Sequence, residues 1–167
     1  GPQALSTYLQ LALELGTAAD RAVFCSATHI VDGAGRVTGT QGFDPRLWVD
    51  AVEHAALTEK LGVPVLHVSA RALLARALTH LRNPFNFAAT CYPRCLYELV
   101  EGYGGGALIN PDKTFVWKLL SVAEDVYFVD APLFSYRVHD ANQTAQQRVS
   151  GSLNHLLDLY RATFDTA

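Results

Sequence analysis

Two basic side chains stand at alternate positions near the end of an apolar segment, in the run VDAPLFSYRVHDANQT at residues 129–144. On an extended chain Arg137 and His139 project from the same face, because successive side chains of a strand alternate. A guanidinium group binds phosphate or carboxylate, and an imidazole is a common ligand of Mn²⁺-type ions. The same two side chains can instead cap a sheet edge with polar groups that face solvent. The pattern leaves both interpretations open.

Asp112 is the second candidate for chemistry, since it follows Pro111 where the run DKTFVWKLLSVA predicts the start of a helix. Backbone N–H groups orient a carboxylate at such a position. That carboxylate can serve as a general base, or it can simply cap the helix. Further along the helix, Trp117 can stack against a sugar ring or join Phe115 and Leu119 in the core. The residues by themselves decide neither choice.

The composition indicates a folded, globular chain of one domain. Of its 167 residues, 50% are hydrophobic and 17% are charged, which allows a real core. The net charge of −3 and the scattered Lys and Arg residues argue against nucleic acid as a partner, which would need a basic stripe. No apolar run has the length of a transmembrane segment. The cysteines Cys25, Cys91 and Cys95 lack the spacing of a zinc site, and their odd number suits a reducing, cytoplasmic compartment.

The spacing of apolar and turn residues predicts alternating helices and strands. Helices are predicted at 5–15, 44–56, 69–81, 94–100, 111–123 and 149–164, and strands at 21–31, 36–39, 63–68, 87–92, 126–130 and 133–139. Ser6 and Ser69 are expected helix caps, and Asp44-Pro45 is an expected helix start. The Asp32-Gly33 pair predicts a hairpin turn, and Ala131-Pro132 should separate the last two strands. The pattern predicts a mixed α/β domain.

Three of these segments, in this order, resemble the second half of a family 2 glycosyltransferase with the GT-A fold. CYPRCLYELVEGY at 91–103 is similar to the family's xxRRxxYExVGGF, the helix from Asp112 to Leu119 to EDxDLWLRL, and APLFSYRVH at 131–139 to PLxxYRxH. The resemblance extends from about Ala22 to His139. It implies a partial GT-A-like (nucleotide-diphospho-sugar transferase) mixed sheet with flanking helices.

The resemblance also implies roles for individual residues. Asp112 stands where the family's acidic pair supplies the catalytic base, and His139 where a histidine approaches a bound Mn²⁺ or Mg²⁺ ion. Arg137 and Lys118 would contact the diphosphate of the donor. Lys118 replaces the family's Arg, so it keeps the charge but loses the bidentate fork, and Pro111 replaces the Glu of the acidic pair.

Two further residues are expected at the substrate. Trp117 is a candidate sugar contact. Asn86 is expected at the rim of the acceptor site, together with Asn83 and the loop Gly104–Gly106, because loops on a rigid scaffold usually carry such contacts.

The expected function is transfer of a sugar from a nucleotide-sugar donor to a glycan or lipid-linked acceptor, with inversion, in bacterial polysaccharide biosynthesis. The chain contains no Asp-x-Asp signature, so we expect the donor-binding half in the remainder of a parent protein and no activity in this chain by itself. Residues 1–2 resemble the remnant of a cleaved expression tag, 3–144 the acceptor-side half, and 145–167 an amphipathic helix. We expect the protein in the cytoplasm, or at the inner face of the membrane through its parent protein.

A different class of function remains open. The chain can be a non-catalytic module that docks other domains of a larger multidomain protein through its last helix, whose apolar positions are Val149, Leu153, Leu156, Leu157, Tyr160 and Phe164. An Asp-x-Asp segment in the parent protein would favour the enzyme.

Overall fold

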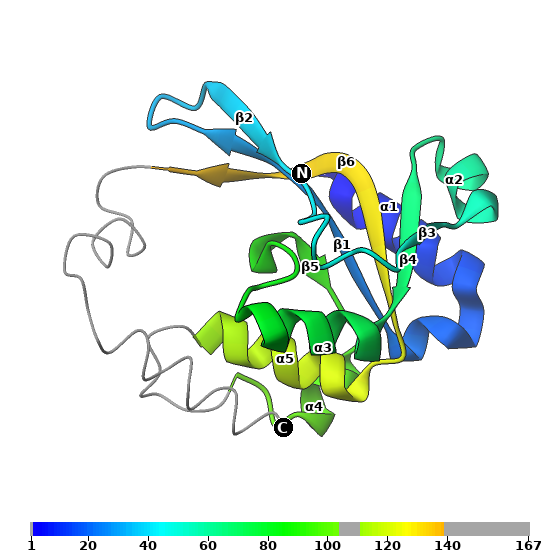
Figure 1. Ribbon diagram of the computed structural model, residues 1–167. Helices are drawn as coiled ribbons and strands as arrows, with labels where there is room; N and C mark the ends of the chain where they lie inside the picture. Colours follow the sequence, from blue (N-terminus) through cyan, green and yellow to red (C-terminus); the bar gives the residue numbers. More distant parts are fainter. Residues whose placement is uncertain (1, 104–110, 139–167) are drawn as a thin grey trace, which may run out of the picture.

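A computed structural model describes residues 2–103 and 111–138, which form a curled mixed sheet with helices on both faces (Figure 1). The helices are α1 (Pro2–Leu15), α2 (Ala55–Leu61), α3 (Ala70–His80), α4 (Arg94–Leu99) and α5 (Pro111–Val122). The strands are β1 (Ala22–Val31), β2 (Val37–Gln41), β3 (Val52–Glu53), β4 (Val65–Ser69), β5 (Thr90–Cys91) and β6 (Asp125–Arg137). Two 3₁₀ helices, Gly16–Arg21 and Phe87–Ala89, connect these elements.

The sheet is built around the parallel pair of β1 and β6. Their register runs from Ala22 beside Asp125 to Val31 beside Arg137. The remaining pairs are antiparallel, and the strand order is β2-β1-β6-β4-β3, with β5 beside β1. The expected mixed α/β sheet with flanking helices is therefore confirmed.

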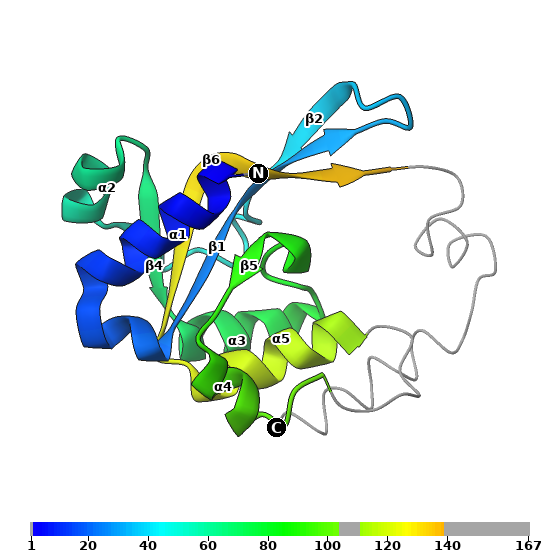
Figure 2. The ribbon, with the colours of Figure 1, turned by 180° about the vertical axis from the view of Figure 1, so that it is seen from behind.

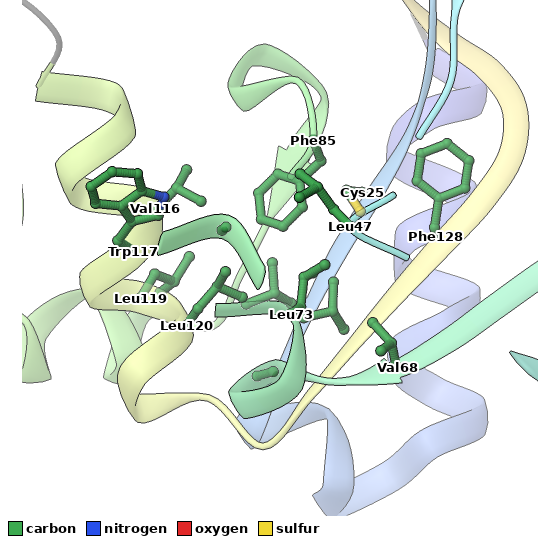
Figure 3. Close-up of a cluster of buried hydrophobic side chains, with 14 of the residues drawn as sticks. Cys25, Leu47, Val68, Leu73, Phe85, Val116, Trp117, Leu119, Leu120 and Phe128 are labelled. Atoms are coloured by element: carbon green, nitrogen blue, oxygen red, sulfur yellow. The ribbon is translucent and has the colours of Figure 1, made fainter. Parts of the chain in front are cut away.

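The larger core lies between the sheet and the pair α3 and α5 (Figure 3). Cys25 and Phe128 enter it from the sheet, and Leu73, Trp117 and Leu120 enter it from the helices. Alternate side chains of each strand point to opposite faces, so the two faces of β1 and β6 are buried in different cores. Figure 3 shows Phe128 of β6 and Cys25 of β1 on the side of the two helices.

A smaller core lies on the other face of the sheet, beneath α1 (Figure 2). Tyr8 and Leu11 of α1 pack there against Phe24 of β1 and Tyr127 of β6. The hydroxyl of Tyr8 donates a hydrogen bond of 2.7 Å to the carbonyl of Ala89, and burial raises the pKa of Tyr8 well above its ordinary value. This bond ties α1 to the segment that precedes β5.

Helices α3 and α5 run in opposite directions because of the strands they adjoin. Helix α3 directly follows β4 and α5 directly precedes β6, and β4 and β6 are antiparallel. At one end of the pair, the N–H of Ala70 donates to the carbonyl of Glu124 at 2.8 Å. At the other end, Nζ of Lys113 donates to the carbonyl of Leu81 at 3.4 Å. The end of α3 therefore lies beside the start of α5.

Much of the predicted order of elements is confirmed. The helices predicted at 5–15, 69–81, 94–100 and 111–123 correspond to α1, α3, α4 and α5, and the Asp32-Gly33 turn joins β1 to β2 in a hairpin. Ser6 does not cap α1, because the helix begins at Pro2 and the Ser6 hydroxyl donates to the carbonyl of Gln3. Ser69 occupies the N-cap position of α3 but makes no capping hydrogen bond with its side chain.

The predicted helix at 44–56 is wrong. The carbonyl of Asp44 accepts hydrogen bonds from the N–H groups of Leu47 and Trp48, at 2.9 and 3.2 Å, and the chain then leaves this single turn. Val52 belongs to β3, where it pairs with β4, and the helix starts only at α2. The imidazole of His54 caps α2 by accepting from the N–H of Leu57 at 3.3 Å. The apolar residues of this segment belong to a turn, a strand and a helix, but their spacing in the sequence is that of one helical face.

Two predicted strand boundaries are also wrong. The strands predicted at 126–130 and 133–139 form one continuous strand, β6, because the register of β1 shifts on either side of Ala27, opposite the Ala131-Pro132 pair. An irregularity of this kind accommodates a proline within a sheet. The strand predicted at 87–92 is reduced to β5 after a 3₁₀ helix. The helix predicted at 149–164 lies outside the described residues.

Within residues 2–103 and 111–138, no helix has both the length and the apolar character that a membrane span requires.

Substitutions at Gly62 and Gly102 test how Tyr97 of α4 packs against the residues that follow this helix. Their φ values are nearly equal, 68° and 69°, so an alanine at either position incurs the same left-handed strain of about 1 kcal/mol. A Cβ atom at Gly102 would lie 2.7 Å from the Tyr97 hydroxyl oxygen, whereas none of the described atoms lies within 4 Å of one at Gly62. We expect Gly102→Ala to lower the free energy of unfolding in urea by on the order of 1 kcal/mol more than Gly62→Ala.

The additional loss of stability in Gly102→Ala should come from displacement of the Tyr97 ring. The centroid of this ring lies 6.4 Å from that of Tyr92 and 5.8 Å from that of Phe115. In a Tyr97→Ala background the two glycine substitutions should cost the same. Equal costs in the wild-type background would contradict the contact between Gly102 and Tyr97.

Candidate functional site

An open cleft of about 660 Å³ lies where α3 ends and α5 begins. Elements from distant parts of the sequence line it: the end of β2 and the residues after it, the loop between α3 and β5, the first turn of α5, and the end of β6. The lining residues are Gln41, Gly42, Asp44, Leu81, Arg82, Asn83, Pro84, Phe85, Asn86, Phe87, Ala88, Asp112, Lys113 and Tyr136. The cleft thus brings together three of the predicted residues, Asp112, Asn86 and Asn83.

Two buried tryptophans fix the loop that forms one wall of the cleft. The indole N–H of Trp117 donates to the carbonyl of Arg82 at 3.3 Å, and that of Trp48 donates to the carbonyl of Pro84 at 2.9 Å. Leu81 leaves α3 in the left-handed region at φ 51°, which starts the turn. Because each indole is itself embedded in the larger core, the loop backbone is positioned by the core.

The predicted acceptor residue Asn86 has a structural task of its own. Its side-chain oxygen accepts a hydrogen bond of 3.0 Å from the N–H of Ala88, and its carbonyl accepts one of 2.9 Å from the hydroxyl of Thr90. Asn86 therefore caps the 3₁₀ helix Phe87–Ala89 while it also lines the cleft. The amide nitrogen of the side chain can still donate to a ligand.

Trp117 is not exposed at the cleft, so it offers no surface to a sugar there. Its side chain is completely buried, among residues of the larger core, and its ring has no face exposed to the cleft. Figure 3 shows the indole beside Val116 and above Leu119 and Leu120 on α5. Of the two interpretations of this residue, the structure supports the core role, and Trp117 acts on the cleft only through the carbonyl of Arg82.

The other predicted residues are placed as follows. Lys118 is half-buried on α5 and does not belong to the residues that line the cleft. Arg137 is exposed at the end of β6, next to Tyr136, which does line the cleft. His139 lies outside the described residues, so the structure does not test whether it binds a metal.

The charges of the cleft include a tightly held carboxylate. Asp44 accepts two hydrogen bonds from the side chain of Arg46, at 3.0 and 2.8 Å, and one from its backbone N–H at 3.1 Å. It also lies 3.4 Å from Nη1 of Arg82. The hydrogen bonds from Arg46 are the main cause that lowers the pKa of Asp44 to about 2. Asp44 is therefore ionised at any physiological pH.

The charge of Asp112 affects the pKa of two nearby groups, Lys113 and Tyr103. Lys113 is half-buried, and burial lowers the pKa of its ammonium group, while the charge of Asp112 opposes that shift. Burial also raises the pKa of Tyr103 to about 12, with the charges of Tyr92 and Asp112 as further causes. The ring of Tyr103 packs edge-on against Phe87 of the cleft wall, with the ring centroids 5.2 Å apart. An aromatic group thus borders the site near Asp112.

The sequence analysis missed four residues of the site. Arg82, Lys113 and Asp44 line the cleft, and Trp48 holds its wall. Asp44 was assigned to a helix start, and no pattern in the sequence marked the other three. Arg82 and Lys113 reach one cleft through the approach of α3 to α5, and Asp44 and Trp48 reach it from the turn after β2.

The described residues do not by themselves make a metal site. Within residues 2–103 and 111–138, no three His, Cys, Asp or Glu side chains lie close enough together to hold a metal ion.

Comparisons with models of protein families, with curated proteins and with solved structures found no match for this chain. The function has to be inferred from the cleft itself.

The tryptophan contacts predict a local effect on the cleft wall. Trp117→Phe and Trp48→Phe each remove the donor to a loop carbonyl, and we expect each to lower the free energy of unfolding by about 1–3 kcal/mol. The loop should also open more often than the rest of the protein. Hydrogen exchange measures this directly, because the amide of Ala89, bonded to the carbonyl of Asn86, should exchange faster.

Val116→Ala is the matched control, since Val116 is a buried neighbour on α5 that donates nothing to the loop from its side chain. It should lower overall stability without a selective increase in the exchange of Ala89. Unchanged exchange of the loop in both tryptophan variants would contradict their role in holding the cleft wall.

Proposed function

We propose that this chain is the acceptor-side part of an inverting glycosyltransferase domain similar to family 2, and that Asp112 is its catalytic base. One observation carries the proposal. Asp112 lies in the first turn of α5 and lines an open cleft of about 660 Å³, which is large enough for a sugar. The order of the three sequence motifs around this helix agrees with that role.

The chemistry asked of Asp112 is a single proton transfer. As the acceptor hydroxyl attacks the anomeric carbon of the donor, its O–H bond breaks and the proton moves to the Asp112 carboxylate. The new C–O bond forms while the bond from the anomeric carbon to the diphosphate breaks, and the diphosphate leaves with the electron pair. Asp112 lines the cleft that the acceptor would enter, so its carboxylate is placed to receive that proton.

The rest of the cleft offers groups that hold a sugar. Gln41, Asn83 and Asn86 present amides to sugar hydroxyls, and the ring of Phe87, backed by Tyr103, provides an apolar edge. The side chains come from several elements whose backbones are held by the core. A rigid acceptor site of this kind aligns one hydroxyl with the base.

The donor is bound elsewhere in this proposal. A nucleotide-sugar would be held by a donor-binding half in the parent protein, with Arg137 and Lys118 contributing to its diphosphate from this chain. A divalent ion, Mn²⁺ or Mg²⁺, would neutralise charge on that diphosphate, with His139 as one ligand. The acceptor would be a glycan or a lipid-linked sugar, handled in the cytoplasm or at the inner face of the membrane.

A second candidate function, a docking module in a larger protein, is favoured by one feature of α1. Leu5, Leu9 and Leu13 recur every four residues on this helix and are 74%, 61% and 73% exposed. Leu5 and Leu9 line an apolar groove of about 370 Å³, together with Tyr8 and Phe24. Leu9→Ser separates the two functions: it should weaken assembly of the parent protein if the module docks there, and it should leave acceptor binding in the cleft unchanged.

The proposed base predicts a specific kinetic defect. In the parent enzyme, Asp112→Asn should lower kcat by about 10² to 10⁴-fold with little change in donor KM, because the lost interaction belongs to the transition state. Lys118→Gln, at a neighbouring position outside the cleft, should affect donor KM more than kcat. Activity of Asp112→Asn within a few-fold of wild type would mean that Asp112 is only a helix cap.

Because the proposal places the donor-binding half in the parent protein, we predict that this chain binds nucleotide-sugar donors poorly. Calorimetry with UDP-, GDP- and dTDP-sugars in the presence of Mn²⁺ should detect no micromolar binding, because the chain lacks an Asp-x-Asp signature. Micromolar binding of any of the three donors would show that the donor site is already present in these residues.

A further inference from the structure

Two cations enter the cleft from different elements and meet beside Asp112. Arg82 comes from the loop after α3, and Lys113 from the first turn of α5. The charges of Arg82 and Asp112 both act on the Lys113 ammonium group, and all three residues line the cleft. Neither cation was identified from the sequence, and neither has a part in the proton transfer derived above.

The contacts of these two cations within the described residues are weak. Arg82 lies 3.4 Å from an oxygen of Asp44 that already accepts a 2.8 Å bond from Arg46. Lys113 reaches the carbonyl of Leu81 at 3.4 Å. Charge-assisted N–H···O bonds are normally about 2.7–2.9 Å long, so both cations retain donors for a closer partner.

The balance of charge favours an anion over a neutral ligand. Two cations, Arg82 and Lys113, and two carboxylates, Asp44 and Asp112, line the cleft. Arg46, which is not a lining residue, already compensates the charge of Asp44, so Asp112 is the carboxylate left to oppose the two cations. Lys113 is half-buried, and burial lowers its pKa because the charged form has lost water. An anion bound beside Lys113 would compensate that loss.

Asn83 supplies a second indication that a ligand enters here. Its side-chain oxygen is buried and has no hydrogen-bond partner among the described residues. Buried polar atoms are nearly always hydrogen-bonded, so this oxygen calls for a donor. Asn83 lines the cleft next to Arg82, and a sugar hydroxyl would be such a donor.

We propose that Arg82 and Lys113 form an anion subsite in the cleft, with Asn83 binding an adjoining hydroxyl, and that the acceptor is a sugar bearing an anionic group. That the bound sugar is an acceptor rests on the proposed function, whereas the anion subsite itself does not. A carboxylate, as in a hexuronic acid, and a phosphate, as in a sugar phosphate, share the required chemistry. Either would receive a bidentate bond from the Arg82 guanidinium and a bond from the Lys113 ammonium group.

The test is a titration of the ¹⁵N-labelled 167-residue chain with four probes: methyl glucuronide, glucose 6-phosphate, methyl glucoside and inorganic phosphate. We expect one of the two anionic sugars to bind about tenfold tighter than methyl glucoside, because bonds to charged groups contribute about 1.5–3 kcal/mol. Shifts should be confined to the backbone amides of the loop at 82–86, in which Pro84 has none, and to those of 112–114. Which anionic sugar binds tighter distinguishes a carboxylate from a phosphate acceptor.

Substitutions then assign the binding to the two cations. Arg82→Gln and Lys113→Gln should each weaken the anionic sugar by about five- to tenfold and leave methyl glucoside unchanged, while Arg82→Lys should retain part of the affinity. Arg71→Gln, an exposed arginine on α3 outside the cleft, is the matched control and should bind like the wild type. Amide spectra outside the cleft that match the wild type will show that each variant is folded.

The pH dependence gives a readout that a structural role would not produce. An anion beside Lys113 favours the charged form of the ammonium group, so binding should raise the pKa of Lys113. The affinity for the anionic sugar should therefore fall as the pH rises through the pKa that Lys113 has in the unbound protein. Lys113→Gln should lose this dependence.

Several outcomes would overturn the anion subsite. These are equal affinity for methyl glucoside and both anionic sugars, unchanged affinity in Arg82→Gln and Lys113→Gln, or inorganic phosphate binding as tightly as glucose 6-phosphate. Asp112→Asn separates this inference from the proposed function, because it should still bind the anionic sugar. If the anionic sugar binds as described and Asp112→Asn stays active in the parent enzyme, the subsite stands and the assignment of the base fails.

Discussion

The parallel pairing of β1 with β6 is the constraint on which the rest of the structure depends. It joins residues about a hundred positions apart in register, from Ala22 beside Asp125 to Val31 beside Arg137. Because α5 leads directly into β6, this pairing also fixes α5 against the sheet. The antiparallel pairing of β4 with β6 then places α3 beside α5 in the opposite direction. The cleft forms where the end of α3, the start of α5 and the end of β6 lie close together.

The core and the cleft are linked by hydrogen bonds as well as by packing. An indole N–H buried without an acceptor costs free energy, and so does a buried carbonyl without a donor. The bonds from Trp48 to Pro84 and from Trp117 to Arg82 satisfy both requirements at once. The loop that carries Arg82, Asn83 and Asn86 is therefore anchored to the core at two of its carbonyls, which favours a preorganised binding site.

The sequence predicted best those parts whose signals are local. Helix α5 has its start at Pro111 and its apolar face within one segment, and the hairpin of β1 and β2 has its turn at Asp32-Gly33. Asp112 was identified because a carboxylate at a helix start is visible in the sequence.

The features that the sequence did not predict depend on contacts between distant segments. The role of Trp117 could not be decided, because a sugar platform and a core residue have the same spacing on a helix. Arg82 and Lys113 are ordinary surface types in the sequence, and only the antiparallel packing of α3 on α5 brings them to one cleft. The turn at Asp44 was mistaken for a helix because its capping residue and its apolar residues also suit one.

The most direct test of the central claim is an experimental structure of the domain with an acceptor sugar bound. The distance to be measured joins the Asp112 carboxylate to the nearest sugar hydroxyl oxygen. If Asp112 is the base of a glycosyl transfer, the sugar will lie in the cleft with one hydroxyl about 2.6–3.2 Å from that carboxylate. A sugar bound away from the cleft, or one bound there with every hydroxyl beyond reach of Asp112, would contradict the account.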